Sequence, residues 1–214
     1  MFEKKYSHIL NEVGILPVIC PENKTDLDTV LKAILPSRIR CMEITLRHPF
    51  AAEAIAYIKE YHSEIIVGAG TVTTEEKLNI ALKCNADFCV SPGLNVDLVL
   101  QADRLNMPFV PGCSIPSEML AAKDLGLTTL KFFPADCLGG VKALNLYKGA
   151  LEGLSFIPTG GITQDNFEEY ISCDNVLACG GSFMMPKQML KSGDSSNINS
   201  IINSLINTYE RVKK

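Results

Sequence analysis

The feature that most restricts the fold of this chain is an alternation of apolar runs and amphipathic segments, repeated eight times. Each run reads as a strand, and each following segment carries apolar residues at helical spacing. Eight such units predict an α/β fold, a parallel (β/α)₈ barrel of the TIM type, with an open doubly wound sheet as the alternative. The expected strands are Gly14–Cys20, Ile39–Leu46, Ile65–Gly70, Asp87–Ser91, Pro108–Gly112, Thr128–Phe133, Ser155–Thr159 and Val176–Gly180.

Length and helix signals agree with this repeat. With 214 residues and no linker rich in Pro, Gly or Ser, residues 1–214 are expected to form a single domain. A polar helical leader precedes the first strand. Thr25-x-x-Asp28 and Thr73-x-x-Glu76 predict capped helix starts, and a final helix is expected to carry Ile198 and Ile206.

Composition excludes several classes of function. The chain is 47% hydrophobic and 21% charged, as in ordinary globular proteins, and its net charge of −4 with scattered basic residues gives no footprint for nucleic acid or an anionic membrane. It has no signal peptide and no apolar stretch long enough for a membrane span. Eight cysteines without a C-x-x-C pair, and only three histidines, predict reduced thiols in a cytoplasmic protein and no metal site.

The sixth strand contains a lysine where a packed apolar side chain is expected. In LKFFPA, residues 130–135, alternation places Lys131 and Phe133 on the inward face. An unpartnered buried ammonium is costly, so the amine is expected to be neutral and able to form a Schiff base with a carbonyl substrate. The alternative is a structural lysine that reaches solvent or pairs with a carboxylate. Phe133 is a candidate cover for an imine, or simply a core aromatic.

The second strand, CMEITLR, places two opposite charges inside the expected barrel. Glu43, Thr45 and Arg47 alternate with apolar residues and therefore share the inward face. Glu43 is a candidate proton shuttle close to Lys131, and Arg47 can present its guanidinium to a substrate carboxylate. The alternative is a buried Glu43–Arg47 ion pair that serves the fold alone.

Glycine-rich strand ends indicate a ligand with a phosphate group. The third strand ends in VGAGTV, where Thr71 offers a hydroxyl and an N–H group, although such ends also occur as plain turns. PTGGI, residues 158–162, and GGS, residues 180–182, end the seventh and eighth strands, the place where barrels of this type bind phosphate through backbone amides. The expected ligand is a small phosphorylated molecule with a carbonyl group.

Eight short motifs occur along the chain in this order: EITLR, VGAGTV, SPG, PGCS-x-PSE, LKFFPA, GGVKAL, PTGGI and GGS. Together they resemble the bacterial family of 2-keto-3-deoxy-6-phosphogluconate and 4-hydroxy-2-oxoglutarate aldolases (KDPG and KHG aldolases). The resemblance runs from about Gly14 to Ser182. It implies a class I aldolase of the Entner–Doudoroff pathway, a lyase on a (β/α)₈ barrel, usually a homotrimer and requiring no metal or cofactor. The implied partner is a phosphorylated 2-keto acid, cleaved to pyruvate and glyceraldehyde 3-phosphate.

The same resemblance implies a role for each candidate site residue. Lys131 matches the Schiff-base lysine and Glu43 the proton-transferring glutamate. Arg47 and Thr71 match the groups that hold the pyruvate carboxylate. The positions that match the carboxylate- and phosphate-contacting loops are Thr159, Gly160, Gly161 and Ser182.

Three departures from the family pattern bear on the choice of aldehyde. Ile115 stands where many members have a small hydroxyl residue, His48 where Thr or Ser is frequent, and Phe183 in place of a frequent tryptophan. Within the aldolase class, the substrate alternatives are 4-hydroxy-2-oxoglutarate, the galactonate-derived stereoisomer and oxaloacetate. Outside that class, a non-catalytic phosphosugar-binding barrel and a metal-dependent enzyme are the alternatives.

Overall fold

The computed structural model describes residues 2–213, apart from the side chains of Glu3 and Lys4. Its strands are β1 (Ile15–Ile19), β2 (Cys41–Thr45), β3 (Ile66–Gly70), β4 (Phe88–Val90), β5 (Phe109–Val110), β6 (Gly112–Cys113), β7 (Thr129–Phe132), β8 (Ser155–Pro158) and β9 (Cys179–Gly181). Its α-helices are α1 (Phe2–Val13), α2 (Lys24–Ile34), α3 (Ala51–Tyr61), α4 (Glu75–Lys83), α5 (Val96–Arg104), α6 (Pro116–Asp124), α7 (Gly140–Ala150), α8 (Phe167–Ile171), α9 (Lys187–Ser192) and α10 (Ser195–Lys213), and a 3-10 turn, η1, spans Asp136–Leu138.

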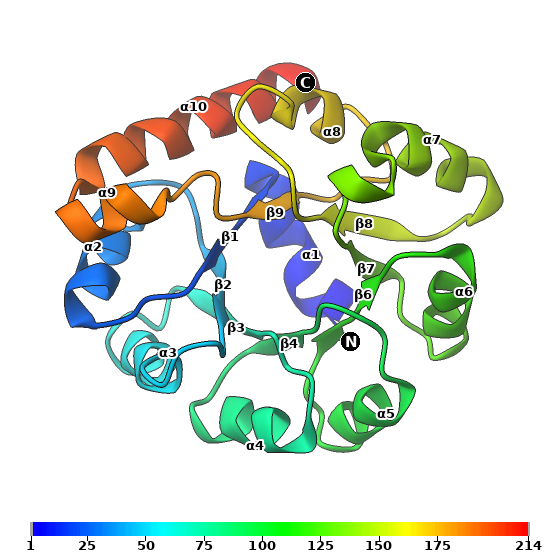
Figure 1. Cartoon of the computed structure of the whole chain (residues 1–214), viewed down its shortest axis with the longest axis horizontal. Coiled ribbons are helices and arrows are strands. Elements are labelled where there is room, and N and C mark those ends of the chain that lie inside the picture. Colours follow the sequence, from blue (N-terminus) through cyan, green and yellow to red (C-terminus); the bar gives the residue numbers. More distant parts are fainter. Residues whose placement is uncertain (1, 214) are drawn as a thin grey trace.

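The strands form curved parallel sheets with helices outside them (Figure 1). One sheet has the order β5-β4-β3-β2-β1-β9 and the other the order β6-β7-β8. Every named strand pair is parallel. The predicted parallel α/β fold is therefore confirmed, and each of the eight predicted strand regions contains a strand.

The fifth predicted strand is divided into β5 and β6 at Pro111. Proline has no N–H group and cannot donate to the sheet ladder, which accounts for the break. Its carbonyl oxygen still accepts a hydrogen bond from the Lys131 N–H group at 2.9 Å. The register pairs Gly112 with Lys131, so the catalytic candidate on β7 lies directly beside this interrupted segment.

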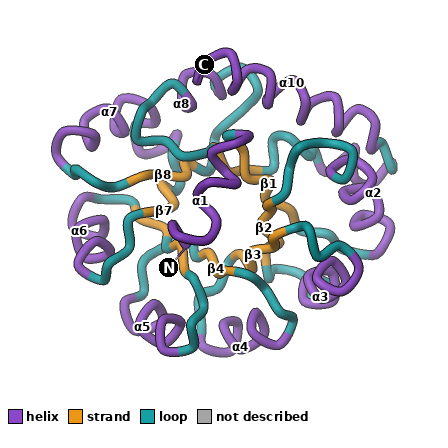
Figure 2. Tube along the Cα trace, turned by 180° about the vertical axis from the view of Figure 1, so that it is seen from behind, coloured by secondary structure: helices purple, strands orange, loops and turns teal. Residues whose placement is uncertain are grey.

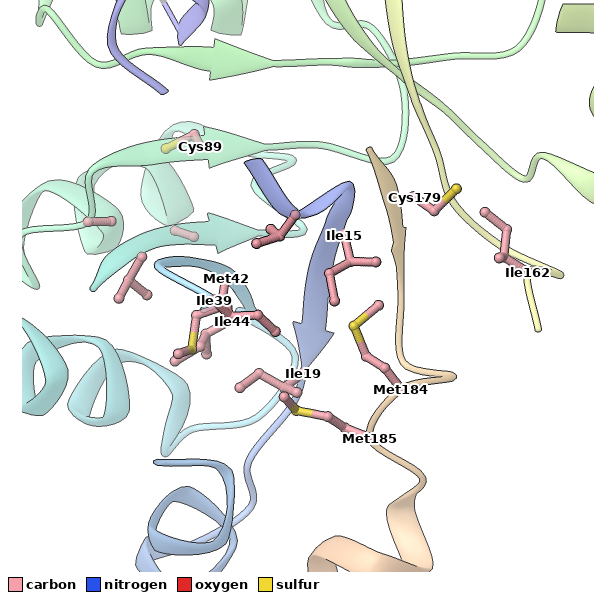
Figure 3. Packing of buried hydrophobic residues seen from close by; sticks show 14 of the residues in the cluster. Ile15, Ile19, Ile39, Met42, Ile44, Cys89, Ile162, Cys179, Met184 and Met185 are labelled. Carbon is pink, nitrogen blue, oxygen red and sulfur yellow. The ribbon is translucent and has the colours of Figure 1, made fainter. Parts of the chain in front are cut away.

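The layer between strands and helices is apolar, as the alternation predicts. Met42 and Ile44 of β2 and Leu130 and Phe132 of β7 are fully buried in one hydrophobic cluster. Figure 3 shows part of this cluster, including side chains of β1, β2 and the segment that follows β9. Because these residues occupy the outer face, their neighbours in the alternation point inward.

A second hydrophobic cluster fills the inner face at one end of the strands. Phe2 and Leu10 of α1 pack with Leu16, Phe88 and other strand residues. In Figure 2 this helix is seen in front of the opening of the ring of strands. The predicted leader is thus a helix, but its place across the strand ends was not predicted. The sequence shows that one side of this helix is apolar, but not which part of the protein that side covers.

Two predicted helix caps are wrong by one or two positions. Helix α2 is capped by Asn23, whose Oδ1 accepts a hydrogen bond from the Asp26 N–H group at 2.9 Å, and not by Thr25. Helix α4 is capped by Thr74 and not by Thr73. In both places adjacent residues can cap, and the backbone path decides between them.

The chain after β9 forms two helices where one was predicted. The short helix α9 ends at Gly193, which has a positive φ of 74°, and α10 carries the predicted Ile198 and Ile206. No helix in residues 2–213 is long and apolar enough to cross a membrane. All eight cysteines are free thiols, and six are buried: Cys41, Cys84, Cys89, Cys113, Cys173 and Cys179.

Candidate active site

Lys131 and Glu43 form a buried ion pair on the inner face of the strands. The Lys131 Nζ atom lies 3.3 Å from Glu43 Oε2 and 3.4 Å from Oε1. Lys131 is 7% exposed and Glu43 1%. A buried pair contributes little net stability, so the presence of two charges inside the protein is better explained by chemistry than by folding.

The alternative Glu43–Arg47 ion pair does not form. Within the described residues, the ion-pair partner of Glu43 is Lys131. The Arg47 Nε–H group donates instead to Thr45 Oγ1 at 3.1 Å, and the Thr45 hydroxyl donates to the Ile19 carbonyl oxygen at 3.3 Å. Arg47 lies two residues after the end of β2, farther along the chain than the buried Glu43 carboxylate. Its side chain is therefore held by the Thr45 hydroxyl instead of by Glu43.

The ion pair lies in a cavity of about 400 Å³. All nine candidate site residues line it: Glu43, Arg47, Thr71, Lys131, Phe133, Thr159, Gly160, Gly161 and Ser182. They come from the C-terminal ends of β2, β3, β7, β8 and β9 or the loops that follow. The structure therefore brings together every residue that the sequence singled out, although their individual roles stay predictions.

Phe133 lies beside the amine, as its shared face with Lys131 predicts. The Lys131 Nζ atom is 5.5 Å from the centre of the Phe133 ring. The Ser114 hydroxyl donates a hydrogen bond to the Phe133 carbonyl oxygen at 2.9 Å and so fixes the backbone of this residue. An aromatic ring at this distance attracts an ammonium and also limits the access of water.

Thr71 has a backbone conformation that threonine rarely adopts. Its φ of 60° is in the left-handed region, where a β-branched side chain is strained. The Lys77 Nζ atom donates to the Thr71 carbonyl oxygen at 3.1 Å and helps to hold this turn. Strain of this kind at a cavity wall is typical of functional residues.

The glycine loops border the cavity with backbone. Gly160 and Gly161 have positive φ values of 92° and 81°. Their carbonyl oxygens accept hydrogen bonds from the Asp136 N–H group at 3.1 Å and the Asn166 amide at 3.0 Å. On the neighbouring strand, a Cβ atom on Gly180 would lie 2.5 Å from Thr159 Oγ1, so only glycine fits there.

Five further residues that line the cavity were not named individually as site residues, although Ile162 stands in PTGGI and the two glycines in GGS: Val18, Pro92, Ile162, Gly180 and Gly181. Alternation on β1 could have placed Val18, two residues after the inward Leu16. Pro92 and Ile162 lie in loops, where no periodic signal positions a side chain, and Gly180 and Gly181 belong to β9. Of the three departures from the family pattern, only Phe183 borders this cavity. Ile115 is 50% exposed at the start of α6, and the His48 Nδ1 atom accepts a hydrogen bond from the Phe50 N–H group.

The chemistry available in the cavity is that of an amine and a carboxylate. Its lining, as far as residues 2–213 describe it, includes no cysteine, and burial raises the pKa of Cys89 and Cys113 elsewhere to about 12. No group of three or more His, Cys, Asp or Glu side chains among the described residues could hold a metal ion. An amine paired with a carboxylate suits covalent catalysis on a carbonyl compound.

Several known proteins that are similar to this chain in sequence and in fold are named aldolases. The 2-dehydro-3-deoxy-phosphogluconate aldolase of Treponema pallidum is 38% identical over 192 residues, 90% of this chain and 91% of that protein. The KDPG aldolase of Legionella pneumophila, solved with pyruvate captured at low pH as a covalent carbinolamine intermediate, is 30% identical, with a TM-score of 0.89 and coverage of 93% of this chain and 97% of that one.

A third similar protein is the 2-keto-3-deoxy-6-phosphogluconate aldolase of Zymomonas mobilis ZM4, solved with 3-phosphoglycerate. It is 31% identical, with a TM-score of 0.87 and coverage of 94% of this chain and 95% of that one. The family model described as KDPG and KHG aldolase matches residues 6–201. On this match and these identities, the chain belongs to the KDPG and KHG aldolase family.

Proposed function

We propose that the protein is a class I aldolase that cleaves 2-keto-3-deoxy-6-phosphogluconate to pyruvate and glyceraldehyde 3-phosphate. The observation that carries the proposal is the Lys131–Glu43 pair at 3.3 Å in a cavity bordered by glycine loops. The relative from Legionella pneumophila, captured with covalently bound pyruvate, supports a carbonyl substrate. The relative solved with 3-phosphoglycerate supports a phosphorylated one.

The reaction starts at the amine. Glu43 accepts the proton that the Lys131 ammonium must lose, and the neutral amine attacks the C2 ketone to give a carbinolamine. Loss of water forms an iminium ion, which serves as an electron sink. Arg47 and Thr71 hold the C1 carboxylate, and the ring of Phe133 limits access of water to the iminium.

Glu43 acts twice more after the iminium ion has formed. Once Glu43 has released its first proton to the leaving water, its carboxylate removes the C4 hydroxyl proton, directly or through a water molecule. The C3–C4 bond breaks, its electron pair moves into the enamine, and glyceraldehyde 3-phosphate leaves. Glu43 then returns a proton to C3, and water hydrolyses the resulting iminium ion to pyruvate and the Lys131 ammonium, which restores the starting ion pair with the Glu43 carboxylate.

Trapping tests this proposal directly. Intact-protein mass after incubation with pyruvate and borohydride, followed by peptide mapping, is expected to find one reduced adduct, on Lys131. Lys131→Ala is expected to remain folded, to form no adduct at this position and to lose turnover. A wild-type protein without an adduct, or a Lys131→Ala variant that still cleaves substrate, contradicts the mechanism and favours a non-catalytic phosphosugar-binding barrel.

The same amine chemistry extends to 4-hydroxy-2-oxoglutarate, which would give pyruvate and glyoxylate, in keeping with the double name of the family. The galactonate-derived stereoisomer and oxaloacetate decarboxylation use the same iminium ion. Turnover of these four substrates by one preparation ranks the activities, and the two six-carbon epimers report the stereochemistry accepted at C4.

The proposal includes a single closed (β/α)₈ barrel for residues 1–214. Two isolated bridges, Phe156–Val176 and Thr159–Gly180, join β8 to the segment of β9, and Pro111 alone separates β5 from β6. These contacts support closure of the two sheets into one ring. In hydrogen exchange, the N–H group of Leu177, which donates to the Phe156 carbonyl oxygen at 2.9 Å, is then expected to be as protected as those inside β2.

A homotrimer in the cytoplasm completes the proposal. Exposed apolar side chains on neighbouring outer helices support self-association: Val96 and Leu100 of α5, Leu120 of α6 and Leu146 of α7. Eight free thiols suit a reducing compartment. Light scattering after size-exclusion chromatography is expected to give three times the mass of the chain, 23.4 kDa.

A further inference from the structure

A second cavity adjoins the catalytic one. It has a volume of about 380 Å³ and shares Val18, Arg47 and Ser182 with the first cavity. Its remaining lining residues are four without charge, Ile19, Cys20, Met185 and Leu190, and two with charge, Glu22 and Lys187. Because Ser182 borders both cavities, a group bound at Ser182 lies next to both of them.

The charges of the proposed substrate leave one cation unassigned. Among the described residues that line the two cavities, the basic side chains are Arg47, Lys131 and Lys187. In the proposed mechanism Lys131 forms a covalent bond to the C2 carbon, and Arg47 binds the C1 carboxylate. The distal phosphate then has backbone amides and the Ser182 hydroxyl, which supply hydrogen bonds but no full positive charge. Lys187 is the basic residue that remains.

Lys187 is held in an exchangeable ion pair. Its Nζ atom lies 2.6 Å from Glu22 Oε1, and the two side chains are 68% and 36% exposed. The hydrogen bond from Lys187, together with its charge, lowers the pKa of Glu22 below its usual range. A pair this exposed is weak, so the lysine can leave it at small cost.

A neighbouring lysine can take over the carboxylate. The Lys191 Nζ atom lies 3.8 Å from Glu22 Oε2, while Lys191 does not line either cavity. If Lys187 turns away, Glu22 therefore keeps a basic partner. This arrangement favours exchange of Lys187 from a carboxylate to a more highly charged phosphate.

We propose that Lys187 is a specificity-determining residue that leaves Glu22 to bind the distal phosphate of the substrate where the two cavities meet at Ser182. The inference rests on the proposed aldolase function and adds a residue that selects phosphorylated over unphosphorylated substrates. The phosphate lies at this junction, where the glycine loops border it from the first cavity and Lys187 from the second, and Glu22 competes with it for the lysine.

The test compares two substrates that differ only in the phosphate. For the six-carbon keto acid with and without its phosphate, Lys187→Ala is expected to lower the ratio of the two kcat/KM values by about fivefold, mainly through KM. Glu22→Gln, which removes the competing carboxylate, is expected to raise that ratio. The matched control is Lys191→Ala, which removes the same charge next to Glu22 outside the cavities and is expected to leave the ratio unchanged.

A binding measurement separates this inference from the proposed function. Glycerol 3-phosphate has no carbonyl group and reports the phosphate contact without turnover. By calorimetry its Kd is expected to rise about fivefold in Lys187→Ala and to stay the same in Lys191→Ala. An unchanged Kd and ratio in Lys187→Ala, or an equal loss in Lys191→Ala, overturns the role of Lys187 even if pyruvate still traps on Lys131. A protein that traps no pyruvate but shows the expected change in Kd fails as an aldolase and keeps Lys187 as a phosphate ligand.

Discussion

The Glu43 carboxylate lies 3.3 Å from the Lys131 ammonium although 88 residues separate them in the chain. Parallel strands on different sheets hold the two groups, with Glu43 opposite Gly68 of β3 and Lys131 opposite Gly112 of β6. On their other sides the two residues have branched neighbours, Val18 beside Glu43 and Ile157 beside Lys131. The free space next to the pair is the cavity of about 400 Å³ that both residues line. The ion pair therefore has room for a substrate carbon, which a tightly packed structural pair would lack.

Replacement of the carboxylate should separate imine formation from bond cleavage. Glu43→Gln keeps the shape of the side chain but cannot accept a proton, so kcat for cleavage is expected to fall by about 10²- to 10⁴-fold. Pyruvate trapping on Lys131 is expected to persist but at a lower rate, because the amine remains and has lost the carboxylate that takes its proton. Steady-state kinetics and adduct mass measure the two effects. Glu168→Gln, which removes a carboxylate from an exposed pair with Arg211, serves as the control, and an equal loss there would contradict a specific role of Glu43.

A methyl group on Gly70 should displace Glu43. A Cβ atom at this position would lie 2.1 Å from Glu43 Oε1, so Gly70→Ala is expected to lower kcat by about 10²-fold and stability by about 1–3 kcal/mol. The control is Gly149→Ala on α7, where a Cβ meets nothing within 4 Å and a gain of up to about 1 kcal/mol is expected.

Urea unfolding and kinetics of both variants check the prediction for Gly70. In a Glu43→Ala background the stability cost of Gly70→Ala should shrink, because the carboxylate that it meets is gone. A cost that stays the same in this background would assign the effect to another contact.

Buried thiols should make the protein sensitive to alkali. Burial raises the pKa of Cys89 to about 12, from an ordinary value of 9.0. Above pH 9 the unfolded chain loses this proton while the folded chain keeps it, so unfolding becomes easier as pH rises toward 12. The loss is up to about 1.4 kcal/mol per pH unit for each such thiol.

Variants of two cysteines check this pH dependence. Cys89→Ala is expected to flatten the decline of the free energy of unfolding, measured in urea with a reducing agent at pH 8 to 11. Cys137→Ala removes an exposed thiol instead and should leave the slope as in the wild type. Equal slopes in wild type and Cys89→Ala would argue against a buried, protonated thiol at this position.

The cap of α2 can be checked by a pair of neighbouring variants. Asn23→Ala removes the acceptor for the Asp26 N–H group and is expected to cost about 1 kcal/mol. Thr25→Ala leaves that bond in place and should cost less, since it is the Thr25 carbonyl, not its hydroxyl, that accepts from the Thr29 hydroxyl. Urea denaturation compares the two, and a larger loss in Thr25→Ala would restore the cap predicted from the sequence.

The alternation of residues in β2 and β7 predicted the inward faces correctly, because successive side chains of a strand point to opposite faces. Met42 and Ile44 pack outward, and Glu43 lies inside. The ion-pair partner of Glu43 was harder to predict from the sequence. Sequence spacing suggested both Arg47 and Lys131 as partners, and only the register across several strands decides that the carboxylate reaches Lys131.

Loop residues explain most of what the sequence did not predict. Pro92 and Ile162 line the cavity from loops, where no periodicity reports the direction of a side chain. The short helix α9, and with it Lys187, was missed because six residues carry too little of a 3.6-residue period to be recognised. These segments shape the phosphate end of the proposed site, and so the specificity of the enzyme depends most on what is hardest to read from sequence.

Helix α1 packs with residues at the start of the strands, Leu16, Cys41 and Phe88, whereas the catalytic cavity is lined from the C-terminal ends of the strands. We therefore expect the cavity to have a single mouth, on the side away from α1. Products that leave through a single mouth have to leave one after the other. The aldehyde product, which occupies the outer part, has to depart before pyruvate, which is tethered at depth. Pyruvate is therefore the last product released, and we expect it to inhibit cleavage competitively, whereas glyceraldehyde 3-phosphate gives a noncompetitive pattern.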